Sequence, residues 1–252
     1  MTRLAKILVW SMMILLATAL IAHAQEDDFD KANKYYEDKD YDSAVRMYES
    51  ILDKNVESAA LYYNLGNAYF KKGDLGHAIL NYMKAKRLDP SDEAIRHNLD
   101  FARQFSRVRM EGVTLNPIDS FLGSVVDPYR LNTLAWISSI LFILFFVFLI
   151  LRYGLGMWST ATKAGAIVSL VLLLTVAGLT TFKYRTEYLT ERAVIVADDS
   201  PVYTGPSDQS DKELEGAPGL VVKIIDQSGD YYNVLFENMR RGWIKKDLVA
   251  II

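Results

Sequence analysis

The sequence contains no cysteine among its 252 residues. This absence excludes disulfide bonds, thiolate catalysis and cysteine-ligated metal centres, so any exported domain must be stable through packing alone. A basic stretch typical of nucleic-acid binding is also lacking. The chain has 28 Lys and Arg against 31 Asp and Glu, and residues 25–58 hold eleven acids and five bases. Because nucleic-acid-binding surfaces are basic, we expect no nucleic-acid partner.

Catalytic motifs are missing as well. No H-E-x-x-H, G-x-S-x-G or P-loop pattern occurs. His77 and His97 lie in different repeats without a carboxylate at ligand spacing, and His23 lies in an N-terminal apolar segment. The acidic residues 26–30 are typical of a solvated terminus rather than a cation site. We therefore expect a protein that is not an enzyme and that binds no metal or other cofactor.

Self-similarity at a period of 34 residues is the clearest positive feature. The pairs separated by this period are Ala32 and Gly66, Tyr35 and Tyr69, Ala44 and Ala78, and Tyr48 and Tyr82, and Asn64-Leu65 recurs as Asn98-Leu99. Small residues let antiparallel helices approach closely, while tyrosine and leucine fill the space between successive helical hairpins. The pattern predicts stacked hairpins.

This pattern resembles the tetratricopeptide (TPR) repeat. The resemblance rests on L-G-x-A-Y at 65–69, A-x-x-x-Y-x-x-A at 78–85 and the closing Pro90. It is strong over residues 59–92 and fair over 25–58, where Val56 replaces the proline. A further helix from Ser91 to Arg109, with Ser91 as N-cap, is expected to cap the stack. We assign residues 25–110 to this region.

Two long runs lack charge. Residues 131–151 and 164–182 contain no charged side chain over 21 and 19 positions. About 20 apolar residues cross a bilayer as a helix, so both runs are predicted transmembrane helices. A buried hairpin in a soluble core is the alternative.

Residues 1–24 have the form of a signal peptide. Arg3 and Lys6 precede an apolar run, and Ala22-His23-Ala24 matches a small-x-small cleavage site. An uncleaved anchor is the alternative. Either form places the repeats on the exported, periplasmic side and the 152–163 loop in the cytoplasm. The expected location is the bacterial cytoplasmic (inner) membrane, in a multi-pass topology.

Residues 193–252 contain short runs rich in Val, Ile, Tyr and Phe separated by turn residues, a pattern typical of a small all-β domain. We expect strands near 193–197, 201–203, 219–226, 231–236, 240–244 and 248–251. The segment V-Y-x-G-P-S at 202–207, the Gly-Asp-Tyr-Tyr turn at 229–232 and Gly-Trp-Ile at 242–244 resemble the bacterial SH3 (SH3b) domain, a small SH3-like barrel. Tyr231 and Trp243 are candidate residues of a ligand surface, with core or rim packing of Trp243 as the alternative. Residues 111–130 are a linker or an interfacial helix, and residues 183–192 are a linker.

The TPR register places a set of polar and aromatic side chains toward a concave groove. The candidate groove residues are Asn33, Asn64, Asn67, Asn98, Tyr36, Tyr63 and Phe70, with Phe29 nearby. An asparagine side chain both donates and accepts hydrogen bonds, so it can bind the backbone of an extended peptide. Capping and bonding between helices is the alternative role. Asn33 and Asn64 match asparagines of carboxylate-clamp TPR proteins, but the clamp cations are replaced by Phe29, Ala94 and Asn98, so a neutral segment or helix is the expected ligand.

The order of signal peptide, TPR region, two transmembrane helices and SH3b-like domain resembles the BatE-type proteins of the Bat (aerotolerance operon) family. That resemblance implies membrane-protein partners, including Bat proteins with von Willebrand A domains, and a role in oxidative or envelope stress tolerance. The whole chain is thus expected to be a multidomain membrane protein that acts as a scaffold. The competing hypothesis is an envelope anchor or sensor whose SH3b-like domain binds peptidoglycan.

Overall fold

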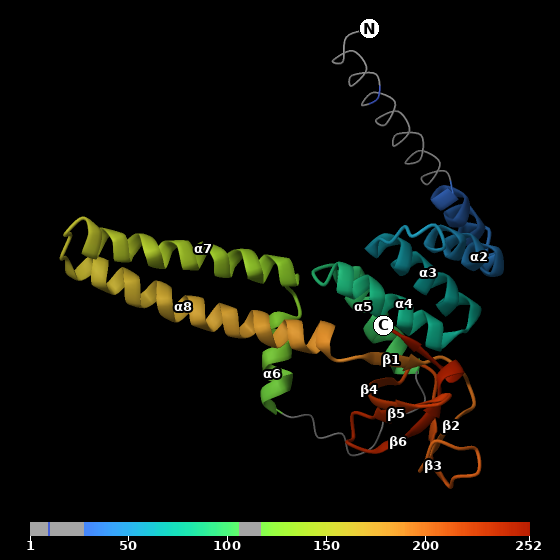
Figure 1. The fold of residues 1–252 in the computed structure, drawn as a ribbon. Coiled ribbons are helices and arrows are strands. Elements are labelled where there is room, and N and C mark those ends of the chain that lie inside the picture. The colour runs from blue at the N-terminus through green and yellow to red at the C-terminus, as the bar shows by residue number, and fades with distance from the viewer. Residues whose placement is uncertain (1–9, 11–27, 106–116) are drawn as a thin grey trace.

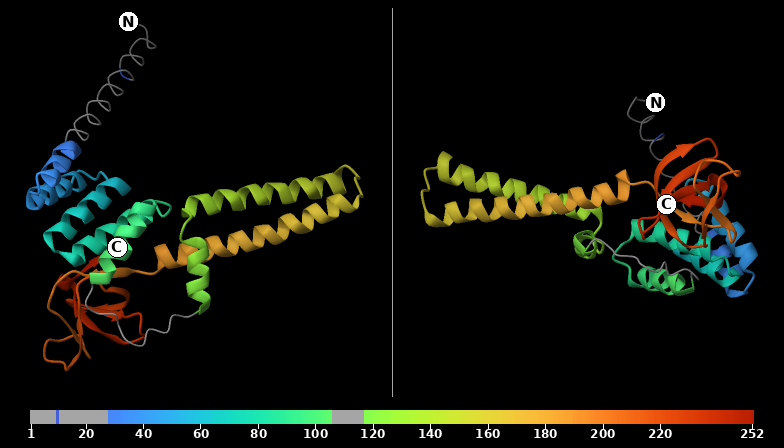
Figure 2. Two further views of the ribbon diagram at one scale, coloured as in Figure 1. Left: turned by 180° about the vertical axis from the view of Figure 1, so that it is seen from behind. Right: turned by 90° about the horizontal axis from the view of Figure 1, so that it is seen from below.

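The computed structural model describes residue 10, residues 28–105 and residues 117–252. The described residues from 28 onward form three parts: a stack of helices, a two-helix hairpin and a β-sheet (Figure 1). A stack of helices and a β-sheet together make a body, and a long two-helix hairpin extends away from that body in every view (Figure 2). Apart from residue 10, the predicted signal peptide at 1–24 falls outside what the structure describes, as do residues 106–116 of the predicted cap and linker.

The helical stack begins with a helix over residues 28–37. It continues with α2 (Tyr41–Leu52), α3 (Ala59–Lys72), α4 (Leu75–Leu88) and α5 (Glu93–Phe105). The helix boundaries repeat with the sequence period. Asp40 before α2 and Asp74 before α4 each accept a hydrogen bond from a backbone amide three residues on, at 3.1 Å. Each of these side chains satisfies one of the free amides at a helix start.

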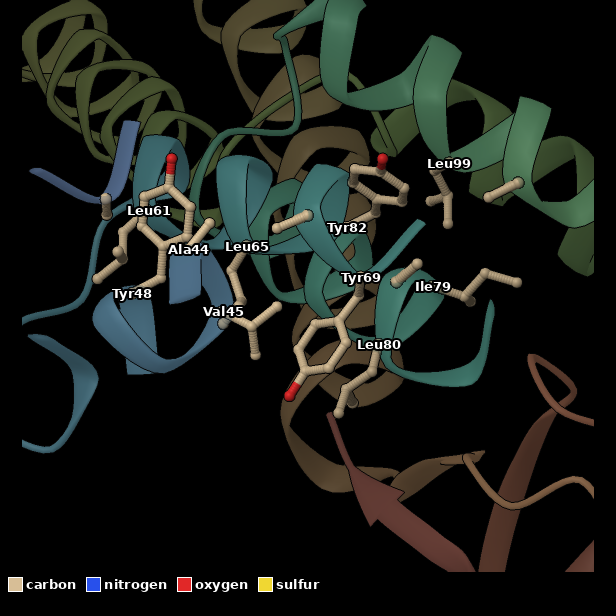
Figure 3. Close-up of a cluster of buried hydrophobic side chains, with 14 of the residues drawn as sticks. Ala44, Val45, Tyr48, Leu61, Leu65, Tyr69, Ile79, Leu80, Tyr82 and Leu99 are labelled. Carbon is tan, nitrogen blue, oxygen red and sulfur yellow. The ribbon is translucent and has the colours of Figure 1, made fainter. Parts of the chain in front are cut away.

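The core of the stack follows from the small residues of the repeat. Ala32, Ala44 and Ala78 are buried completely. A Cβ atom added to Gly66 would lie 2.8 Å from the Tyr82 ring, which shows how closely α3 and α4 approach. Leucine and tyrosine side chains fill the space between the helices (Figure 3).

The cap of α5 differs from the prediction. Asp92, not Ser91, accepts hydrogen bonds from the backbone amides of Ala94 and Ile95, at 2.8 and 3.2 Å. Ser91 instead donates its hydroxyl to Asp89 at 2.7 Å. A carboxylate is an effective helix cap, and Asp92 directly follows the predicted cap Ser91 in the sequence.

The hairpin consists of α7 (Leu131–Leu149) and α8 (Thr160–Tyr184), extended by single π-helical turns at Ile150–Gly154 and Arg185–Leu189. Both helices are long and apolar enough to cross a membrane, and most of their large side chains face outward. A short helix, α6 (Pro117–Val126), precedes them and contacts α8.

Two predicted connections are shorter than expected. The π-helical turn ends at Gly154 and α8 starts at Thr160, so the 152–163 loop reduces to residues 155–159. At the other end the helical rod continues to Leu189, within the predicted 183–192 linker. The buried Lys183 pairs with Glu187 one turn later, which lets the helix continue past the apolar run.

The C-terminal part is one antiparallel sheet in the order β3-β2-β6-β5-β4-β1-β7. Its strands are β1 (Arg192–Ile195), β2 (Ser200–Tyr203), β3 (Lys212–Gly216), β4 (Val221–Ser228), β5 (Tyr231–Leu235), β6 (Arg241–Lys245) and β7 (Val249–Ile251). Six strands correspond to predicted ones. The strand β3 was missed because its sequence, KELEG, is charged and carries a single apolar side chain.

The sheet packs directly against the helical stack through β1. Ala193 and Ile195 belong to the core of the sheet, whereas Val194 belongs to the core of the stack. Alternate residues of a strand point to opposite faces, so β1 is buried on both sides. In Figure 3 the strands approach the stack below Leu80, while the hydroxyl groups of Tyr48 and Tyr82 lie on the opposite side.

Candidate protein-binding groove

The asparagines predicted to line a groove form a hydrogen-bonded ladder across the first helices of the repeats. In the first rung, Asn33 accepts two hydrogen bonds through its Oδ1 atom. One comes from the Tyr48 hydroxyl at 2.6 Å, and the other comes from Asn64 Nδ2 at 3.0 Å. This rung ties the helix over 28–37 to α2 and α3.

The second rung repeats the first one 34 residues later. Asn67 Oδ1 accepts from the Tyr82 hydroxyl at 2.7 Å and from Asn98 Nδ2 at 2.8 Å. Asn98 also donates to the Tyr63 hydroxyl at 3.0 Å. The repeat period therefore preserves a bonding pattern as well as a hydrophobic core.

The tyrosines at the base of the ladder remain protonated donors. Burial raises the pKa of Tyr48 to about 12, and a hydrogen bond with Asn64 opposes part of that shift. Burial likewise raises the pKa of Tyr82. A neutral hydroxyl at ordinary pH can donate to the asparagine oxygen, so the rungs are stable under physiological conditions.

Each rung leaves polar groups that no described residue engages. Within residues 28–105, no hydrogen bond involves Asn33 Nδ2 or Asn67 Nδ2, which are donors, or Asn64 Oδ1, which is an acceptor. A donor and an acceptor side by side match the C=O and N–H groups of a peptide backbone. The ladder thus has a structural role and retains capacity for a ligand.

A cavity of about 200 Å³ lies over the first rung. It is lined by Asn33, Tyr36, Glu37, Tyr48, Asn64 and Asn67. Four of the seven predicted groove residues line this cavity, and Asn98 and Tyr63 adjoin it through the second rung. Tyr48 and Glu37 were missed as lining residues. The fixed 15-residue offset between each rung asparagine and its tyrosine was the available signal for Tyr48.

Phe70 lies apart from the asparagines. Its ring centroid is 5.7 Å from that of Phe101 and 5.6 Å from that of Phe105, both on α5. Phe70 and Phe105 line a separate cavity of about 700 Å³, shared with Asp198, Asp199 and Glu215 of the sheet. The structure therefore divides the predicted groove into an amide-lined part and an aromatic part.

Tyr231 and Trp243 lie on the face of the sheet opposite its core, where Trp243 is partly exposed and Tyr231 is buried. Val234 and Ile244 are in the sheet core, so their strand neighbours Asn233 and Trp243 point to the other face. Asn233 is directly opposite Trp243. The Tyr231 hydroxyl donates to Asp208 at 2.6 Å.

One unsatisfied acceptor lies beside this aromatic pair. Asn233 Oδ1 is buried and, within the described part of the chain, accepts no hydrogen bond. A buried polar atom without a partner is uncommon in folded proteins. Because it is buried, this oxygen is not part of the surface that Trp243 presents.

His77 and His97 are the histidines within residues 28–105, and neither belongs to a cluster of metal-ligating side chains there. His77 Nδ1 lies 2.8 Å from Asp74 Oδ2, so His77 has the carboxylate partner that its sequence context did not suggest. That carboxylate caps α4. No cluster of three or more histidine, aspartate or glutamate residues that could hold a metal occurs in residues 28–105 and 117–252.

A comparison with known families matches the tetratricopeptide repeat over residues 59–92. These residues comprise α3, α4 and the turn after them, and so include Asn64, Asn67 and Tyr82. A comparison with curated proteins finds no match. The TPR repeat indicates a protein-interaction scaffold.

Proposed function

We propose that this protein is a membrane-anchored adaptor that assembles a complex of cytoplasmic-membrane proteins. The observation that carries the proposal is the asparagine ladder, which leaves donors and an acceptor unused over a cavity of about 200 Å³. The groove holds a neutral, extended segment of a partner protein, because its described lining includes one charged residue, Glu37, and no cation. The protein has no catalytic role.

The membrane hairpin supports the adaptor role. It keeps the groove close to the bilayer, where a membrane-protein partner presents its own exported segments. Confinement near the membrane raises the effective concentration of such a partner, so weak contacts suffice. From the resemblance to the BatE-type proteins, the partners are Bat-family membrane proteins with von Willebrand A domains, and the complex acts in oxidative or envelope stress tolerance on the periplasmic side.

The test is co-purification of partners with the full-length protein in mild detergent. In the groove variant, Asn33→Asp and Asn67→Asp keep the oxygen acceptors that the ladder uses but remove the two unused amide donors. In the matched control, Tyr48→Phe and Tyr82→Phe remove ladder bonds from the buried side and leave every amide in place.

We expect the groove variant to lose its partners and the control to retain them. High salt screens the two added charges but cannot restore the donors, so the loss should persist at high salt. An unchanged set of partners in the groove variant contradicts a ligand role for these amides. The asparagines would then have only their structural role.

A second candidate function comes from the outer face of the sheet. The partly exposed ring of Trp243 favours a ligand with an apolar face, such as the glycan of peptidoglycan. The full-length protein should then be retained on purified cell wall. Trp243→Ala should abolish retention, whereas Trp243→Phe should preserve most of it. Equal retention of all three proteins contradicts this function.

A further inference from the structure

A cavity of about 640 Å³ lies where the stack, the sheet, α6 and the end of α8 meet. Its described lining contains seven lysines and arginines and two acids. Both acids are already paired: Asp127 lies 2.8 Å from Lys86, and Glu187 pairs with Lys183. Arg87 also donates to the Ile252 carbonyl oxygen at 3.0 Å. The described lining still leaves the cavity with an excess of positive charge.

Arg192 and Lys223 contribute most clearly to this excess. They are directly opposite each other on the antiparallel strands β1 and β4, so their side chains share one face of the sheet. Like charges in this arrangement destabilise a sheet. Within residues 28–105 and 117–252, neither side chain makes a hydrogen bond or an ion pair. Such an unfavourable arrangement points to a functional site.

Further cations surround this pair. Arg103 of α5 also lines the cavity, and its nearest carboxylate, Asp100, is 3.7 Å away on the outer side of the same helix turn. Burial lowers the pKa of Arg192; the charges of Glu187 and Asp127 oppose that shift, and those of Arg103 and Arg87 add to it. An anion in the cavity would relieve this repulsion.

The position of the cavity indicates the source of the anion. Tyr184 at the end of α8 is exposed, as are Tyr188 and Leu189 in the π-helical turn that follows, and residues 185–187 between them line the cavity. At the far end of the hairpin, Tyr153 and Trp158 are also exposed. Aromatic residues concentrate at both surfaces of a bilayer.

The length of the hairpin fits this placement. The 19 residues of α7 span roughly 28 Å at about 1.5 Å per residue. The hydrocarbon core of a bilayer is about 30 Å thick. The cavity then lies at the level of the lipid headgroups.

We propose that this cavity binds the phosphate group of an anionic phospholipid, whose acyl chains lie along the exposed end of the hairpin. The inference rests on the membrane anchoring in the proposed function. Bound lipid would link the stack, the sheet and the hairpin, since Arg103, Arg192 and Arg185 come from these three parts.

The test uses the full-length protein in mild detergent, titrated with short-chain phosphatidylglycerol while the midpoint of thermal unfolding is followed. Parallel titrations use short-chain phosphatidylcholine and inorganic phosphate. The cavity variant is Arg103→Gln with Arg192→Gln and Lys223→Gln. The control variant, Lys34→Gln with Lys71→Gln and Arg241→Gln, removes the same charge at exposed positions outside the cavity.

Phosphatidylglycerol should raise the midpoint of the wild type and of the control variant, and phosphatidylcholine should raise it far less. The cavity variant should bind on the order of 100-fold more weakly, about fivefold for each cation removed. Without lipid, the cavity variant should be at least as stable as the wild type, because the Arg192–Lys223 repulsion is gone. This result separates lost binding from misfolding.

Three outcomes would overturn the inference. The first is the absence of a lipid-dependent shift in the wild type. The second is an equal loss in the cavity and control variants, which would indicate a general charge effect. The third is a full shift with inorganic phosphate alone, which would assign the site to a free anion. Failure of the membrane anchor itself is distinguished by release of the protein from membranes in an alkaline wash.

Discussion

Gly76, in the first turn of α4, lies against the backbone of Val196, just after β1. A Cβ atom at Gly76 would be 2.6 Å from the Val196 Cα and 2.9 Å from the Val196 carbonyl oxygen. Gly219 makes a similar close approach, because a Cβ there would be 2.4 Å from Ile79 Cδ1. The absence of side chains at these two positions lets the stack and the sheet share one apolar interface.

We predict that Gly76→Ala destabilises the protein, although alanine is the better helix former by about 1 kcal/mol. The clash is with backbone, so the sheet must shift, at a cost of about 1–3 kcal/mol. Denaturant unfolding should show the loss, and amide exchange should increase in β1. The control is Gly123→Ala in α6, where the added Cβ would have no described atom within 4 Å apart from its own helix backbone and chain neighbours. A Gly76→Ala protein as stable as the wild type would contradict the interface.

The turn before α2 offers a stabilising substitution. Lys39 has φ = +64°, and Gly73, 34 residues later, has φ = +89° at the equivalent turn before α4. The left-handed conformation costs a lysine about 1–2 kcal/mol and a glycine almost nothing. After the entropy cost of glycine in the unfolded chain, Lys39→Gly should gain up to about 1 kcal/mol in chemical denaturation. Lys34→Gly, within the helix over 28–37, should lose about 1 kcal/mol. The same sign for both substitutions would refute the argument.

The stack should lose stability in strong alkali. Burial is the largest cause of the raised pKa values of Tyr48 and Tyr62, both about 12, and it also raises the pKa of Tyr69 and Tyr82. Above the unfolded tyrosine pKa of about 10, the unfolded chain releases protons that the native state retains. Stability is therefore fully present below about pH 10 and falls as the pH rises toward the native pKa values.

Unfolding free energies at about pH 9 and about pH 11 measure this dependence. The double variant Tyr48→Phe and Tyr82→Phe provides the control, since phenylalanine cannot ionise. Its stability should fall less steeply over this range than that of the wild type. An identical slope would show that lysine titration, rather than the buried tyrosines, governs the alkaline behaviour.

The sequence predicted the parts of this protein that depend on local pattern. The 34-residue spacing identified the helical repeats, and uninterrupted apolar runs identified both helices of the hairpin. The charged strand β3 carries no such pattern, because its place in the sheet depends on pairing with β2. The Asp92 cap was missed because three capping residues, Asp89, Ser91 and Asp92, lie close together before α5.

Contacts between distant segments were beyond sequence reasoning. The continuous apolar run at 193–197 indicates that β1 is buried on both faces. It does not indicate which helix packs against the strand. The structure joins Asn33 to Asn64 and Asn67 to Asn98, and the sequence left their role open between ligand binding and bonding between helices. Only the geometry shows that the Oδ1 atoms of Asn33 and Asn67 accept hydrogen bonds within the stack, while no described residue bonds to their Nδ2 atoms.

Replacing Asn233 with an apolar residue should raise the free energy of unfolding. Its buried oxygen accepts no hydrogen bond from the described residues, and asparagine is unfavourable in a strand. Asn233→Val should therefore raise stability by about 1 kcal/mol in denaturant unfolding. Asn233→Asp, which buries a charge, should lower it. A destabilised valine variant would show that a bound water satisfies the oxygen.

The absence of cysteine makes the orientation of the hairpin directly measurable, because the wild type gives no background with thiol reagents. Single cysteines at the exposed positions Lys71, Met157 and Gln209 report on the stack, the hairpin turn and the sheet. In cells with a permeable outer envelope and an intact inner membrane, an impermeant maleimide should label Lys71→Cys and Gln209→Cys. Met157→Cys should react only after the inner membrane is disrupted.

The reverse pattern would place the stack and the sheet in the cytoplasm. Labelling at all three positions in intact membranes would show that the hairpin does not span the bilayer. The two π-helical turns make the expected pattern specific, because they place Met157 beyond one end of the hairpin and the body beyond the other. A spanning hairpin therefore requires opposite accessibility at Met157 and Gln209.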